Sequence, residues 1–321
     1  MSTWRSAICA LGLFCVLATP LHAQTLASVN AQLEAQAPGA LASAEAFAKA
    51  NAASTDAWIA VTRARLQAGK AESAIDAAEK ATRLGPKNAQ SFYWLGNAYG
   101  SRIGQVGMFS KMSMAPKLRD AFEHAVALDP NNLDARSSLM EFYLQAPSMI
   151  GGGIDKARVQ ASEIGKRDKS QGFMAQGRIA MQEKKGETAL KFYEAALASK
   201  PGDARARVAT AVAYQELQRW PDAFRLLRAW TAEDPKAGVA WYQIGRASAL
   251  SGQFLDEGAA ALQRYLTLPH GKNEPQKQHA LYRLAQVDAR AGRKEQARVA
   301  LNEALRIDPE YAEAKAELAK L

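Results

Sequence analysis

Residues 92–99 read FYWLGNAY, with an aromatic residue at Phe92, a leucine at Leu95, a glycine at Gly96 and a tyrosine at Tyr99. The stretch WYQIG at 241–245 repeats the aromatic, the aliphatic residue and the glycine at the same spacing. Apolar residues three and four apart lie on one face of a helix. A glycine on that face lets a second helix approach closely. Both stretches therefore predict a helix packed tightly against a neighbour.

The prolines reveal a longer period. Pro201, Pro235 and Pro269 follow one another at intervals of 34 residues. Alanines keep the same register, in a column formed by Ala74, Ala157, Ala189, Ala223 and Ala297. A fixed period of this length indicates stacked helical units, and each proline stops the helix before it.

These columns resemble the tetratricopeptide repeat, which carries W-x₂-L-G-x₂-Y in its first helix and A-x₃-F…P in its second. Residues 92–99 and 241–245 match the first helix, and residues 121–130 and 297–309 match the second. The resemblance covers nearly the whole chain after residue 23. It implies an all-α fold, a right-handed α-solenoid of about seven helix-turn-helix units with terminal caps.

The period sets the unit boundaries. We expect units at 55–88, 89–132, 133–169, 170–203, 204–237, 238–277 and 278–311. Residues 24–54 are expected to form a degenerate N-terminal helical cap, and residues 312–321 a C-terminal capping helix, because terminal repeats face water. The turn inside a unit is expected to hold a glycine in the left-handed conformation, at Gly69, Gly186, Gly252 and Gly292.

The first 23 residues have the composition of a signal peptide. Arg5 precedes an apolar run, and Ala23 is a small residue at the expected cleavage site. The prediction is cleavage after Ala23 and a periplasmic or secreted protein. The alternative is an uncleaved N-terminal anchor. Both cysteines, Cys9 and Cys15, lie in this segment, so the remaining chain would carry no thiol.

No motif for catalysis appears. The sequence contains no H-E-x-x-H, no G-x-S-x-G and no G-x-x-x-x-G-K-[ST] pattern, so we expect no enzyme activity, no metal and no cofactor. The net charge is +9, but basic residues alternate with acidic ones and form no block of five. That pattern argues against a nucleic-acid partner. Peripheral contact with an anionic envelope surface stays open, and the oligomeric state is not determined.

In the repeat class that the sequence resembles, first helices line a concave groove. We expect a protein or peptide partner there, because tyrosine and arginine are common interface anchors. The candidate groove residues are Tyr93, Asn97, Glu141, Arg178, Tyr242, Arg246 and Tyr282, with Ser137 and Met174 in the same exposed columns. Asn97 matches a position where some relatives bind a peptide carboxylate, but Glu141 at the next such position would repel one.

Residues 100–117 are an insertion within one unit. Its apolar residues include Met108, Phe109, Met112 and Met114. One interpretation is an adaptable apolar binding surface. The other is that the insertion lengthens the helices and buries these side chains.

The sequence as a whole predicts a non-catalytic periplasmic scaffold that binds a peptide or protein in its concave groove. The alternative is an accessory adaptor subunit of an envelope-biogenesis complex, docking through its convex face and positive charge.

Overall fold

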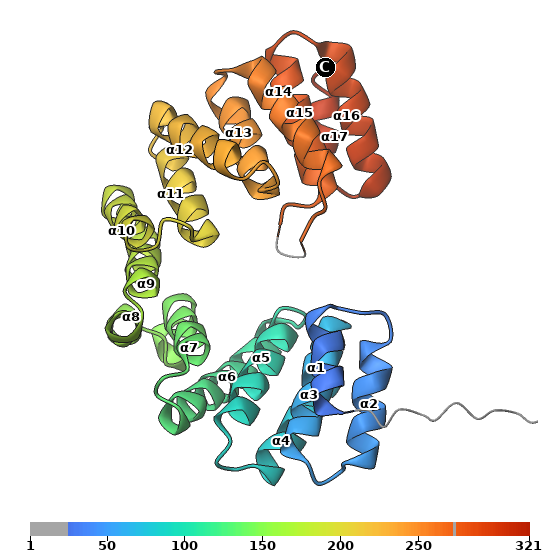
Figure 1. The fold of residues 1–321 in the computed structure, drawn as a ribbon, viewed down its shortest axis with the longest axis vertical. Coiled ribbons are helices and arrows are strands. Elements are labelled where there is room, and N and C mark those ends of the chain that lie inside the picture. Colours follow the sequence, from blue (N-terminus) through green and yellow to red (C-terminus); the bar gives the residue numbers. More distant parts are fainter. Residues whose placement is uncertain (1–24, 272–273) are drawn as a thin grey trace, which may run out of the picture. The chain divides into compact units, whose positions relative to one another are not determined.

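The computed structural model describes residues 25–271 and 274–321. In these residues the secondary structure consists of seventeen α-helices and one 3-10 helix, with no strand (Figure 1). The predicted all-α solenoid of helical repeats is therefore confirmed. The predicted signal peptide, residues 1–23, lies outside the described residues.

The chain divides into two compact units, Met1–Leu128 and Asp129–Leu321. The helices of the first unit are α1 (Leu26–Glu34), α2 (Ala40–Ala50), α3 (Thr55–Gln67), α4 (Ala71–Leu84), α5 (Ala89–Ile103) and α6 (Met108–Leu128).

The second unit begins with α7 (Leu133–Gln145), the 3-10 helix η1 (Ser148–Ile150), α8 (Ile154–Arg167), α9 (Lys169–Gln182) and α10 (Gly186–Ser199). It continues with α11 (Ala204–Glu216), α12 (Trp220–Glu233), α13 (Gly238–Ser251), α14 (Leu255–Thr267), α15 (Lys277–Arg290), α16 (Lys294–Ile307) and α17 (Ala312–Leu318). From α3 to α16, first and second helices of the repeats alternate. The first helices are α3, α5, α7, α9, α11, α13 and α15, and each is followed by a second helix, α4, α6, α8, α10, α12, α14 or α16.

Five of the first helices, α3, α5, α7, α9 and α11, start at a polar residue whose side chain caps them. Asn88 Oδ1 accepts hydrogen bonds from the backbone N–H groups of Gln90 at 2.9 Å and Ser91 at 3.3 Å. Asp168 and Asp203 cap α9 and α11 in the same way. These side chains pair N–H groups that the first helical turn leaves without a partner.

The glycine column lies where first and second helices touch. A Cβ atom on Gly96 would lie 2.5 Å from the ring of Phe122, and one on Gly177 would lie 2.4 Å from the ring of Tyr193. On Gly245 it would lie 2.2 Å from Leu262. A glycine is needed at each position because the facing side chain fills the space that a Cβ would occupy.

The turn glycines are confirmed at three of the four expected positions. Gly69, Gly252 and Gly292 have φ angles of 73°, 74° and 78°. Gly186 is a wrong prediction, because it is the first residue of α10 and Lys184, with φ 59°, takes the left-handed position. Gly186 serves packing instead, since a Cβ there would lie 3.0 Å from the side chain of Leu217.

None of the helices in the described part of the chain is both long and apolar enough to cross a membrane.

Candidate functional site

An open pocket of about 260 Å³ in the second unit is lined mainly by α7 and α9, with further residues from α10 and the start of α11. Its lining residues are Ser137, Met140, Glu141, Gln171, Met174, Ala175, Arg178, Tyr193, Asp203 and Arg205. Four of them, Ser137, Glu141, Met174 and Arg178, come from the exposed columns that the sequence indicated. We call this pocket the α7–α9 groove.

An ion pair joins the two repeats across the α7–α9 groove. Arg178 Nη2 donates to Glu141 Oε1 at 2.6 Å, and Gln145 Nε2 donates to the same oxygen at 2.6 Å. Burial raises the pKa of Glu141, but the hydrogen bonds from Arg178 and Gln145 outweigh it and hold the pKa below its ordinary value. Glu141 is therefore ionised and its charge is compensated by Arg178.

Tyr93 and Asn97 lie half-buried on α5, in the first unit. Asn97 Nδ2 donates to the backbone oxygen of Tyr93 at 2.9 Å, so this amide is engaged within its own helix. The ring of Tyr93 packs against Trp94 and Phe122, with centroid distances of 5.3 and 6.1 Å.

Tyr242 is not on an exposed face, contrary to the sequence prediction. Only 8% of its surface is accessible, and its ring centroid lies 5.4 Å from that of Tyr265 on α14. Burying an aromatic ring against another one stabilises the helix pair more than leaving it in water. Tyr242 therefore belongs to the core between α13 and α14.

Arg246 and Tyr282 are partly exposed, on α13 and α15. Arg246 Nη1 donates to the side-chain oxygen of Gln215 on α11. The Tyr282 hydroxyl accepts a hydrogen bond from Gln286 Nε2 at 2.9 Å, and its ring lies 5.4 Å from that of Tyr311.

Sequence reasoning missed Arg283, the residue directly after Tyr282. Arg283 Nη1 donates to Gln286 Oε1 at 2.8 Å, and its guanidinium lies 5.6 Å from the ring centroid of Tyr282. The signal was available, because Arg283 and Gln243 share the column that directly follows the chosen column of Tyr242 and Tyr282.

The insertion at 100–117 lengthens the helices, as one of the two interpretations expected. Residues up to Ile103 belong to α5, and α6 begins at Met108 and contains Pro116. The expected burial is wrong, however, because Met108, Phe109 and Met112 are 70%, 91% and 45% exposed. Met114 is half-buried. The first turns of α6 therefore present apolar side chains to solvent, and their use in binding stays a prediction.

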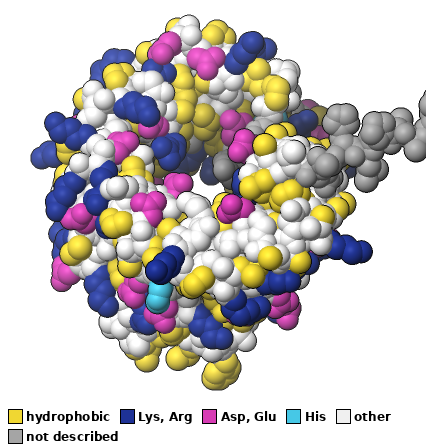
Figure 2. Space-filling view, turned by 60° about the horizontal axis from the view of Figure 1, so that its bottom comes forward, with side chains coloured by type: hydrophobic (Ala, Val, Ile, Leu, Met, Phe, Trp, Pro, Cys, Tyr) yellow, Lys and Arg dark blue, Asp and Glu magenta, His cyan; other side chains and the backbone are white. Residues whose placement is uncertain are grey.

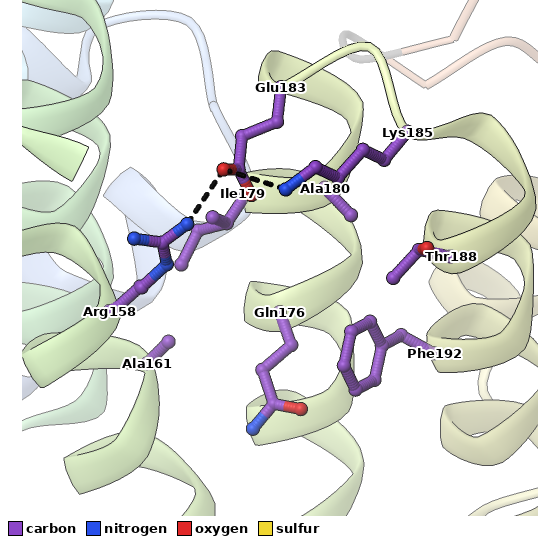
Figure 3. Close-up of a pocket in the computed structure, with 9 residues that line it drawn as sticks. All are labelled: Arg158, Ala161, Gln176, Ile179, Ala180, Glu183, Lys185, Thr188 and Phe192. Atoms are coloured by element: carbon purple, nitrogen blue, oxygen red, sulfur yellow. Dashed lines mark hydrogen bonds and ion pairs between the residues drawn. The ribbon is translucent and has the colours of Figure 1, made fainter. Parts of the chain in front are cut away.

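The second helices border pockets that the sequence did not indicate. One of about 330 Å³ lies between α8 and α10, with α9 between them (Figure 3). Glu183 accepts hydrogen bonds there from Arg158 at 2.6 Å and Lys185 at 3.2 Å. Gln176 and Phe192 line the same pocket, away from these charged groups (Figure 3). The charges at this pocket are thus paired with one another.

A second pocket, of about 770 Å³, is lined by α14, α15 and α16. Arg293 bridges the carboxylates of Asp256 and Asp288 there, at 2.7 Å each. The charged side chains named at these two pockets are therefore paired with one another.

Charged side chains of both signs are mixed over the visible face of the molecule, with Lys and Arg in dark blue among Asp and Glu in magenta (Figure 2). Among residues 25–271 and 274–321, no group of three or more His, Cys, Asp or Glu side chains is arranged to hold a metal ion.

Sequence models described as tetratricopeptide repeat match three segments, residues 62–99, 180–244 and 278–311. The segment 180–244 spans α10, α11 and α12, and the segment 278–311 covers the helix pair α15 and α16. The chain is a tetratricopeptide-repeat protein. The tetratricopeptide repeat is in general a scaffold for protein–protein interaction, and the fold is typically non-catalytic.

Solved structures share the fold of this tetratricopeptide-repeat protein. A tetratricopeptide repeat protein from Parabacteroides merdae is 14% identical with a TM-score of 0.54, and the match covers 83% of this chain and 97% of that one. The hetero-tetramer Cut9–Hcn1 of APC/C matches at 16% identity and a TM-score of 0.53, over 88% of this chain and 52% of that one. No curated protein matches the sequence.

Proposed function

We propose that this tetratricopeptide-repeat protein is a non-catalytic scaffold of the periplasm, or a secreted one, which binds a peptide segment of a partner protein along its first helices. The observation that carries the proposal is the α7–α9 groove. It combines apolar walls, from Met140 and Met174, with polar groups held in place by the ion pair of Arg178 and Glu141.

Rigidity makes this groove suited to binding. Arg178 is held by two hydrogen bonds to Glu141, and Glu141 by a third from Gln145. Side chains that are already ordered lose little conformational entropy when a partner arrives. Met174 has a flexible, polarisable side chain that adapts to apolar groups of different shape.

The proposed location rests on residues 1–23, with Arg5, the apolar run and Ala23. Mass spectrometry of the protein taken from its own cells tests it. We expect an N-terminal peptide that begins at Gln24, and recovery of an intact N-terminus would contradict cleavage after Ala23.

Photo-crosslinking in intact cells tests the groove. A photoreactive amino acid replaces Ser137 or Met174 in the groove, or Phe109 on α6, and Val159 serves as the control because it is 58% exposed on α8. We expect Ser137 and Met174 to capture the same protein and Val159 to capture none of it. Capture from Val159 alone would favour docking through the second helices. Phe109 reports separately on the exposed apolar turns of α6.

A further inference from the structure

Two arginines of the second unit lie on neighbouring first helices without an acidic partner. Arg246 of α13 donates to Gln215, and Arg283 of α15 donates to Gln286 at 2.8 Å. Both acceptors are neutral amides. In the described part of the chain, neither guanidinium lies within ion-pair distance of a carboxylate.

This arrangement differs from that of the other arginine in the equivalent column. Arg178 follows Gly177 as Arg246 follows Gly245. Arg178 is neutralised by Glu141 at 2.6 Å. Arg246 instead meets a chain of amides, because Gln215 in turn donates through Nε2 to Gln243 Oε1 at 3.2 Å. The positive charge at Arg246 is thus held in place but not compensated.

The electrostatics of the pair are unfavourable in the free protein. Burial lowers the pKa of Arg246, and the positive charge of Arg283 lowers it further. Tyr242 and the exposed carboxylate of Glu216 act in the opposite direction but do not reverse the lowering of the pKa. The helices that carry the two arginines, α13 and α15, pack against each other. Two like charges in a partly desolvated place cost free energy, and an anion that accepts hydrogen bonds from both guanidinium groups would relieve that cost.

Aromatic side chains adjoin the arginines. The guanidinium of Arg283 lies 5.6 Å from the ring centroid of Tyr282, and Tyr282 lies 5.4 Å from Tyr311. These rings offer apolar surface beside the cationic groups. The hydrogen bonds to Gln215 and Gln286 each use Nη1. The Nε and Nη2 groups of both arginines can therefore donate hydrogen bonds to a carboxylate.

We propose that Arg246 and Arg283 form a subsite for the carboxylate of an aspartate or glutamate side chain, so that the peptide bound along the first helices is acidic. The inference rests on the proposed scaffold function and deepens it, because it assigns a chemistry to the partner. Gln215 and Gln286 position the two guanidinium groups, and Tyr282 and Tyr311 contact the apolar part of the peptide.

Fluorescence anisotropy at low ionic strength tests the subsite. The probe is a fluorescein-labelled, C-terminally amidated peptide of alternating glutamate and alanine, compared with its glutamine counterpart. We expect the glutamate peptide to bind the full chain about tenfold more tightly. Arg246→Gln and Arg283→Gln should each weaken it about five- to tenfold, since each removes charge-assisted hydrogen bonds.

Arg264→Gln is the matched control, because Arg264 is exposed on α14 and its loss changes the net charge equally. It should leave binding within about twofold. An equal loss in Arg264→Gln would mean attraction to the overall charge and would overturn the subsite. Circular dichroism checks folding, and if Arg246→Gln does not fold, Arg283→Gln, on a different helix, decides the question.

Two further results would overturn the inference. One is equal binding of the glutamine and glutamate peptides. The other is equally tight binding of a polyalanine peptide with a free C-terminus, which would assign the subsite to a chain terminus. If Ser137 and Met174 capture a partner but the glutamate peptide does not bind, the scaffold function stands and only the acidic subsite is wrong.

Discussion

At the scale of single residues, the same position in successive repeats often makes the same bond with a different side chain. Trp241 Nε1 donates to the backbone oxygen of Pro235 at 3.0 Å, six residues earlier. In the equivalent positions of other repeats, Arg136 donates to Pro130 and Arg207 to Pro201, at 2.7 and 2.8 Å. The helix start is thus tied to the preceding turn whether the column holds tryptophan or arginine.

The tyrosine column makes a second recurring bond. Tyr99 donates to Glu79 at 3.0 Å and Tyr214 to Glu194 at 2.6 Å, each twenty residues back on the preceding second helix. Burial, followed by the hydrogen bond and charge of the glutamate, raises the pKa of both tyrosines to about 12. Each bond joins one repeat to the next.

Alkaline pH should therefore weaken the fold. The folded protein keeps the Tyr214 proton up to about pH 12, while the unfolded chain releases it near the ordinary value of 10.0. The free energy of unfolding should fall as pH rises from about 10 to about 12. Tyr214→Phe should lose about 0.5–1.5 kcal/mol at neutral pH and decline less steeply above pH 10. Urea denaturation at several pH values measures both, and an unchanged slope in the variant would contradict the shifted pKa.

At the scale of helix pairs, glycine contacts set the distance between first and second helices. Adding a methyl group at Gly177 would bring a Cβ atom to 2.4 Å from the Tyr193 ring. Gly177→Ala should destabilise α9 and α10 by about 1–3 kcal/mol through overpacking. Gly202→Ala is the control, because no atom lies within 4 Å of the new Cβ there. Denaturation midpoints that do not differ between the two variants would refute the packing explanation.

The sequence predicted which segments form helices more fully than which faces they bury. The 34-residue period located the helix pairs because Pro and Gly end helices locally. It did not distinguish the buried Tyr242 from the half-exposed Tyr282 in the same column. The difference in exposure depends on the side chain that packs against each tyrosine. Tyr242 of α13 packs against the buried ring of Tyr265, which lies on another helix, α14.

At the scale of the whole molecule, a repeat protein is stabilised by contacts between neighbouring helical repeats. Within the second unit, α9 packs on α8 and α10, and α13 on α14 and α15. A local change is therefore expected to have a local effect, in contrast to a globular domain with one shared core.

Hydrogen exchange tests this directly. Gly177→Ala should speed amide exchange in α9, α10 and the adjoining α8 and α11, because these helices share its contacts. The amides of α13 to α16 should exchange as in the unchanged protein. Uniformly faster exchange throughout the second unit would show instead that it unfolds as one cooperative block.

The sequence by itself determined that the chain forms helical repeats, because helix ends follow from local backbone preferences and the period repeats many times. Only the tertiary structure decided which groove residues are paired. Glu141 meets Arg178 across 37 positions of sequence, whereas Arg246 meets only neutral amides. The physical reason is that charge compensation depends on distances between helices, and the periodicity of one helix carries no information on what its neighbour places opposite.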